Sequence, residues 1–147
     1  MSARPSLFDC AKAEIIDLHR FFVDWYDAAS ADGADFARFE NVMGEGFRMI
    51  PPDDGRIIER DAVMAYVRAN RGQFRHGDFA IGIEDVRPGW EAGGNILVTY
   101  VEAQCRSGVW TRRRASALFT ENSSMPNGVA WQHLHETWLQ ALETRQA

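Results

Sequence analysis

The sequence has few of the residues that mark disulfide-stabilised, membrane-spanning or nucleic-acid-binding proteins. Its two cysteines, Cys10 and Cys105, are too few for a disulfide framework and lack metal-site spacing, so we expect two thiols. No run approaches the roughly 18 apolar residues of a membrane helix, and the first residues lack the apolar stretch of a secretory signal, which predicts a cytoplasmic protein. Lysine occurs once, and a net charge of -5 argues against binding to nucleic acids or anionic membranes.

The motifs of several large enzyme classes are absent too. The chain has no Gly-x-Gly-x-x-Gly, no P-loop, no nucleophile elbow and no Cys-x-x-Cys. Dinucleotide-binding, nucleotide-binding and serine-hydrolase functions therefore lose their usual sequence support. We accordingly expect no cofactor and no metal.

The length and periodicity of the chain predict one domain that begins with helices. The 147 residues are enough for a single hydrophobic core, and we assign residues 1–147 to one domain. Apolar residues recur at helical steps over residues 6–31, with Ser6 as a candidate cap. Shorter helices are predicted over residues 34–43 and 60–72.

Strand patterns dominate the remainder of the sequence. The string "GFRMIPPDDGRIIE" reads as a small hairpin around a proline-aspartate-glycine turn. Four further strands are predicted over residues 79–86, 96–106, 109–120 and 129–139, separated by glycine-containing breaks. Strands joined this tightly pair antiparallel. The expected fold is therefore α+β: a cone-shaped, strongly bent antiparallel sheet packed on three N-terminal helices, with a cavity between the layers.

Three strings and the order of elements resemble the nuclear transport factor two-like superfamily, also called cystatin-like or SnoaL-like. "HLHET", after Trp131, resembles the family's final strand, and "RASALF", with Arg114 and Ser116, resembles its preceding strand. "PPDDGRIIERDAVMAYV" resembles the turn that leads into the family's third helix. The resemblance covers nearly the whole chain and implies a pocket for a small molecule and pairing of two copies through the sheet.

Two departures from the family pattern bear on the expected chemistry. The tryptophan that normally stands four residues before the first histidine is replaced by Val129. The paired aspartates and arginine of the family's epoxide hydrolases, and the aspartate of its polyketide cyclases, have no match in the sequence. The resemblance is therefore specific for the fold and does not select a reaction.

The two histidines of "HLHET" are the first candidates for a site. Regular strand alternation puts Trp131, His133, His135 and Thr137 on one face. Three interpretations stay open: two ligands of a metal that needs a third from elsewhere, a catalytic acid or base at His133 with His135 lining the same site, or hydrogen-bonded structural groups.

The long strands carry further candidates. Tyr100 and Glu102 share a strand face, where a hydroxyl and a carboxylate can polarise and deprotonate a small carbonyl compound. Arg112 and Arg114 lie on one face of a strand and Arg113 on the other. These arginines either cover a solvated or interfacial face, or one of them binds a ligand carboxylate. The resemblance favours Arg114 for the carboxylate.

Aromatic and sulfur-containing side chains complete the expected site. Trp25, Tyr26 and Met49 are candidates for the cavity wall, although such residues also form plain core. The leading hypothesis is a small-molecule pocket protein that acts as a cofactor-independent lyase, isomerase or hydrolase. The alternative is a non-catalytic association module. In both cases we expect a homodimer, since Trp110 and Trp138 are large groups whose burial favours association.

Overall fold

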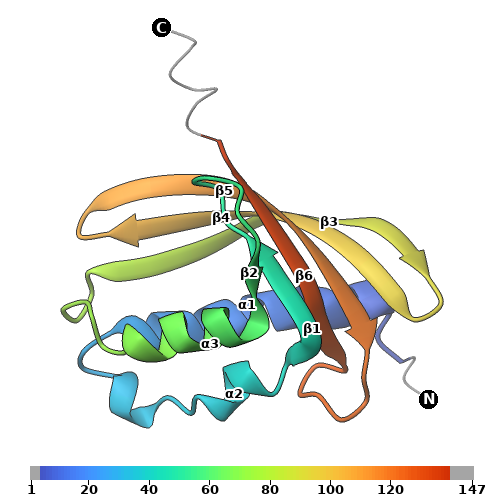
Figure 1. Cartoon of the computed structure of the whole chain (residues 1–147), viewed down its shortest axis with the longest axis horizontal. Helices are drawn as coiled ribbons and strands as arrows, with labels where there is room; N and C mark the ends of the chain where they lie inside the picture. Colours follow the sequence, from blue (N-terminus) through green and yellow to red (C-terminus); the bar gives the residue numbers. More distant parts are fainter. Residues whose placement is uncertain (1–3, 140–147) are drawn as a thin grey trace, which may run out of the picture.

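Three helices pack against one side of a curled sheet, as the α+β prediction requires (Figure 1). The computed structural model describes residues 4–139. The helices are α1, Leu7–Tyr26, α2, Ala37–Glu40, and α3, Arg60–Ala69. Within residues 4–139, none of these helices is long and apolar enough to cross a membrane.

The sheet has six strands in the order β2-β1-β6-β5-β4-β3. Their bounds are β1 Met43–Ile50, β2 Ile58–Glu59, β3 Phe79–Ala92, β4 Asn95–Arg106, β5 Val109–Glu121 and β6 Val129–Trp138. The meander from β3 to β6 is antiparallel as predicted, whereas β1 and β6 run parallel, so the sheet is mixed. Tight hairpins fix the direction of consecutive strands only, and β1 and β6 are far apart in the chain.

The start of α1 is set by a local cap, and the end of α2 by a contact with a distant strand. The Ser6 hydroxyl accepts a hydrogen bond from the Asp9 amide at 3.0 Å, which caps α1. The second helix is a single turn, shorter than predicted, because the chain enters the sheet directly afterwards. The Val42 carbonyl already accepts a hydrogen bond from the Trp131 amide at 2.8 Å.

Strand β3 runs further than the sequence predicted. The expected break at "PGWEAGGN" lies mostly inside the strand, and the turn to β4 is made by Gly93 and Gly94, which have φ values of +57° and +79°. The β3–β4 register has two irregularities, one between Glu84 and Arg87 and one between Pro88 and Trp90, and Gly89 lies in the second. Asp85, with φ 51°, lies in the first of them. These bulges bend the sheet over the helices.

Strand β6 contains a bulge that decides which side chains face the helices. Leu118 pairs with His133 and Phe119 pairs with Trp131, so Gln132 is an extra residue between them. The bulge reverses the alternation beyond it. The prediction that Trp131 and His133 share a face is therefore wrong.

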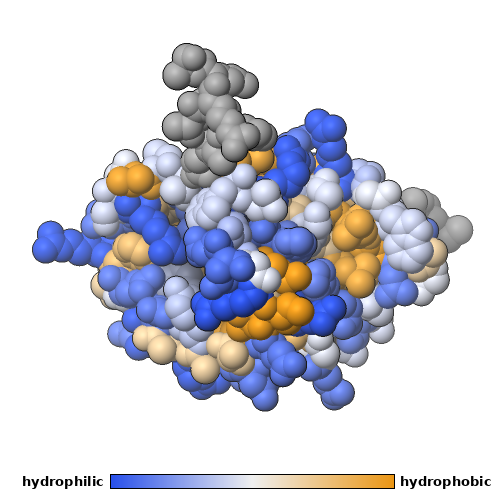
Figure 2. Space-filling view, turned by 45° about the horizontal axis from the view of Figure 1, so that its top comes forward, coloured by the Kyte–Doolittle hydropathy of each residue, from blue (hydrophilic) through white to orange (hydrophobic). Residues whose placement is uncertain are grey.

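Large apolar side chains gather in one core between α1, α3 and the sheet. On the face shown in Figure 2, by contrast, hydrophobic residues lie in separate patches among hydrophilic ones. The largest fully buried side chains include Trp131, Tyr100 and Phe39. These large side chains thus point toward the interior of the cone.

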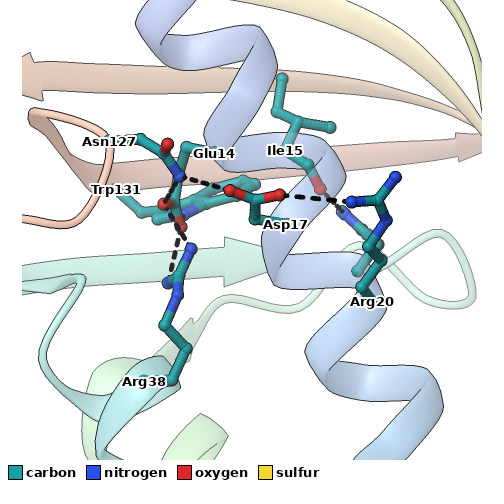
Figure 3. A network of polar contacts seen from close by, with 8 residues as sticks. Glu14, Ile15, Asp17, Arg20, Arg38, Asn127 and Trp131 are labelled. Atoms are coloured by element: carbon teal, nitrogen blue, oxygen red, sulfur yellow. Dashed lines mark hydrogen bonds and ion pairs between the residues drawn. The ribbon is translucent and has the colours of Figure 1, made fainter.

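A buried carboxylate holds α1, the α2 turn and β6 together (Figure 3). Glu14 of α1 is fully buried and accepts hydrogen bonds from Arg38 at 2.7 and 3.1 Å, from Trp131 Nε1 at 2.9 Å and from the Asn127 amide at 3.1 Å. A buried charge is tolerated when it is paired in this way. The Glu14 cluster (Glu14, Arg38, Asn127 and Trp131) fixes Trp131 inside the cone, just before the β6 bulge.

Candidate functional site

A cavity of about 680 Å³ lies between the inner face of the sheet and helices α1 and α3. Most of its wall is apolar, including Phe22, Phe39, Phe47, Met49, Ile81 and Leu134. The polar wall comes mainly from β4, β5 and β6. Its volume is in the range of cavities that enclose small organic molecules.

Strand register brings the polar groups of the wall together. Arg113 of β5 lies opposite Glu102 of β4, in the row next to Tyr100. Glu136 of β6 lies in the Tyr100 row, with the small Ala115 between them. Two carboxyl groups, a guanidinium and a phenol are therefore arranged on one concave face.

His19 of α1 and Glu102 form a buried pair. Ile15's carbonyl oxygen, 2.6 Å from His19 Nδ1, can only accept a hydrogen bond, so Nδ1 carries a proton. The other nitrogen, Nε2, lies 2.9 Å from Glu102 Oε1, and Gln104 donates to the second oxygen of Glu102. One proton is thus shared between His19 Nε2 and Glu102.

Electrostatics put this shared proton on the histidine. Burial alone lowers the pKa of His19, but the Glu102 carboxylate more than offsets it and the pKa is raised. Burial acts to raise the pKa of Glu102, and the charge and hydrogen bond of His19 outweigh it, so that pKa falls well below its usual range. Glu102 is an ionised carboxylate with both oxygens engaged, which makes it a fixed charge and a poor proton acceptor.

Glu136 has the opposite character. Its side chain is 2% exposed, and Arg113 Nη1 donates to Oε1 at 3.3 Å. Burial, reinforced by the negative charge of Glu102, raises the pKa of Glu136 to about 7, against the opposing effects of Arg113 and His19. Near neutral pH both protonation states are populated, as a general acid or base requires.

Two buried polar atoms beside this carboxyl have no hydrogen-bond partner within residues 4–139: the Tyr100 hydroxyl and Arg113 Nε. Burial, followed by the charges of Glu102 and Glu136, raises the pKa of Tyr100, which keeps its hydroxyl protonated. An unpaired buried donor costs free energy. Of the two residues, Arg113 lines the cavity, so its guanidinium is a candidate for contacts with a ligand oxygen.

The comparisons with known proteins agree on the architecture. No family model and no curated protein matches the sequence. An NTF2-like protein of unknown function from Pseudomonas aeruginosa superposes with a TM-score of 0.76 at 22% identity, covering 88% of this chain and 98% of that chain. The chain has the NTF2-like fold. The CaMKII hub of S. rosetta gives a TM-score of 0.69 at 13% identity, with 94% and 99% covered, and a putative ketosteroid isomerase from Parabacteroides distasonis gives 0.59 at 14%, with 87% of both chains covered.

Some predicted site residues lie at the cavity of this NTF2-like cone. Glu102, Tyr26 and Met49 line it. Tyr100 is fully buried next to it, with its ring 5.7 Å from the His19 ring. The predicted site residues of β4, Tyr100 and Glu102, therefore lie at or beside the same cavity as two of the predicted wall residues, Tyr26 and Met49.

Both histidines of "HLHET" point away from the NTF2-like cavity. His133 lies beside Arg48 in the β1–β6 pairing, and His135 is exposed. Partial burial, followed by electrostatic interactions with Arg48 and with the neighbouring His135, lowers the pKa of His133. The prediction that these two residues line the site fails because the Gln132 bulge turns them outward. Within the described residues, no group of three or more metal-ligating side chains is present.

Arg114 and Trp25 also lie elsewhere. Arg114 faces the outer side of the sheet, where its Nη1 donates to Asp85 at 3.2 Å. Trp25 is buried in the core, and its Nε1 donates to the Val67 carbonyl at 2.8 Å. The arginine that faces the cavity is Arg113, and the prediction that Arg114 lies at the ligand site is therefore wrong.

Three functional candidates were missed in the sequence: His19, Arg113 and Glu136. His19 carried a signal, since it follows Ile15 by four residues on the apolar face of α1. Glu136 carried none, because its inward direction depends on the bulge.

Proposed function

We propose that the protein binds a small organic molecule in its cavity and transfers a proton on it without a cofactor, as an isomerase or lyase does. Glu136 carries this proposal. It is a buried carboxyl that titrates near neutral pH beside a guanidinium, on an otherwise largely apolar wall. The putative ketosteroid isomerase among the structural neighbours makes this class of reaction compatible with the fold.

In this proposal ionised Glu136 removes a proton from carbon next to a carbonyl group of the ligand. The electron pair of the broken C–H bond forms a carbon–carbon double bond, the π pair of the carbonyl group moves onto its oxygen, and the Arg113 guanidinium stabilises the charge that develops there. Protonated Glu136 then returns the proton to another carbon, which isomerises the ligand, or to a departing group, which completes an elimination. Burial, together with the charge of the ionised Glu102 that His19 holds, keeps the pKa of Glu136 high.

The test is catalysed exchange of carbon-bound hydrogen in deuterated water, followed by proton NMR over a panel of apolar ketones and keto acids. We expect exchange by the wild type and a loss of about a hundredfold in Glu136→Gln, since general acid-base catalysis contributes on that order. His133→Ala, on the same strand but the outer face, is the matched control. Equal rates for wild type and Glu136→Gln would remove Glu136 from the mechanism.

A second candidate function is an association module. It is favoured by the exposed side chains of Trp90, Val109 and Trp110 and by the CaMKII association domains among the structural neighbours. A non-catalytic module does not require an acid or base in its interior. It therefore predicts no exchange by the wild type for any compound of the panel.

A further inference from the structure

Arg113 is a buried guanidinium with unused hydrogen-bonding capacity. Its side chain is 11% exposed, its carbon Cζ lies 4.7 Å from the centre of the Trp138 ring, and Nη1 donates to Glu136 at 3.3 Å. Nε is buried without a partner within the described part of the chain. A guanidinium presents five N–H donors in a planar fork, which matches the two oxygens of a carboxylate.

The charges around Arg113 leave it incompletely neutralised. The negative charge of Glu102 is shared with His19 at 2.9 Å. Arg106 and Arg56 add positive charge to the cavity lining, while Asp53 accepts a hydrogen bond from Trp138 at 3.2 Å. When Glu136 is protonated, the inner cluster of His19, Glu102, Arg113 and Glu136 carries one excess positive charge. A buried cation without its own counter-charge favours an anionic ligand.

We propose that the cavity takes an organic monoanion, an apolar body carrying a carboxylate that accepts hydrogen bonds from Arg113, and that Glu136 takes up a proton as this anion binds. The inference rests on the proposed function and names the class of its ligand. The fraction of bound Glu136 that stays ionised is the base of that reaction, so the exchange rate of the complex rises with pH. The fork of Arg113 has donors enough to hold the carboxylate of a keto acid and to face its carbonyl oxygen.

Proton uptake follows from the groups that face Glu136. These are His19 from α1, Tyr100 and Glu102 from β4 and Arg113 from β5. A carboxylate bound to Arg113 places a further negative charge beside Glu136 and favours its neutral form. Since that carboxyl titrates at about 7 in the free protein, affinity for the anion falls about tenfold for each pH unit above about 7.

The experiment measures binding of phenyl-substituted alkanoates, from phenylacetate to phenylhexanoate, and of their primary amides by calorimetry at several pH values. The acids are expected to bind at least about tenfold more tightly than the matched amides at about pH 6, with the fall above neutrality just described. Arg113→Gln abolishes the preference for the acid. Arg114→Gln, one residue away on the outer face, leaves it unchanged.

Glu136→Gln tests the proton coupling separately. This variant is expected to bind the acids with an affinity that no longer changes between about pH 6 and 8, because glutamine mimics the neutral carboxyl. Equal binding of acids and amides would overturn the inference that the cavity prefers an anionic ligand, and it would leave the proposed function standing. An unchanged pH dependence in Glu136→Gln overturns the coupling. Binding of neither series overturns the inference, and the exchange assay then decides the proposed function by itself.

Discussion

Glu136→Gln is expected to leave the free energy of unfolding nearly unchanged at about pH 5 and to raise it by roughly 3 kcal/mol at about pH 8. The pKa of Glu136 is raised from 4.5 to about 7 on folding. Because the folded state binds this proton more tightly, the stabilisation is complete below 4.5 and is lost as pH rises to about 7. At about 1.4 kcal/mol per pKa unit, this shift corresponds to roughly 3 kcal/mol of stability that the wild type loses when Glu136 ionises. The glutamine variant keeps this stability because its side chain does not ionise.

Urea denaturation of wild type and variant at a series of pH values measures this effect. Glu59→Gln, which removes an exposed glutamate of β2, is the matched control and is expected to follow the wild type. His19, whose pKa is also raised, makes both proteins less stable as pH rises above 6.5. Because the charge of Glu136 contributes to the raised pKa of His19, the difference between the two proteins reports Glu136 together with its coupling to His19. Parallel pH profiles for wild type and Glu136→Gln would show that this carboxyl titrates normally.

Glu14→Ala is expected to cost about 3–5 kcal/mol of stability, the range found when one partner of a buried ion pair is removed. Glu14 is fully buried, and its loss leaves Arg38, Asn127 and the Trp131 indole without their shared acceptor (Figure 3). The guanidinium of Arg38, with a side chain 22% exposed, would then be a largely buried and uncompensated charge.

Denaturation with tryptophan fluorescence as the readout checks this expectation. Asp17→Ala is the control, because Asp17 lies one helical turn from Glu14 and accepts from the same Asn127 amide, yet its side chain is 44% exposed. Its substitution should change stability by no more than about 0.5 kcal/mol. A Glu14→Ala protein as stable as Asp17→Ala would mean that the Glu14 cluster does not hold β6 in place.

The elements that the sequence predicted well are those with an uninterrupted period. The apolar stripe of α1 and the alternation of β4 and β5 each point to one face, and glycine turns mark where the long strands reverse. The parallel pairing of β1 with β6 has no local signal, because it joins segments separated by most of the chain. The single turn of α2 reflects a tertiary contact, the hydrogen bond between Trp131 and Val42, which overrides helical spacing.

The candidate site was predictable on β4, partly on β5 and not on β6. Tyr100 and Glu102 follow regular alternation, and both point inward. On β5 the buried residues Ala115, Ala117 and Phe119 lie on the same strand face as Arg113. The inward direction of Arg113 could therefore have been predicted from these apolar residues.

On β6 one bulged residue, Gln132, exchanges the two faces of the strand. A shift of one residue moves every following side chain to the opposite face, and the sequence around a bulge of this kind carries no fixed signature. The side chain that faces the cavity is therefore Glu136, three residues after His133 on the same strand.

The most direct measurement is the titration of Glu136 itself. Carbon-13 NMR of the protein labelled at glutamate side-chain carboxyls follows each group with pH, and the resonance absent from Glu136→Gln identifies the one in the cavity. We expect a midpoint at about 7 for this resonance. A midpoint near the 4.5 of an ordinary glutamate would contradict this expectation and would leave the cavity without a neutral-pH acid or base.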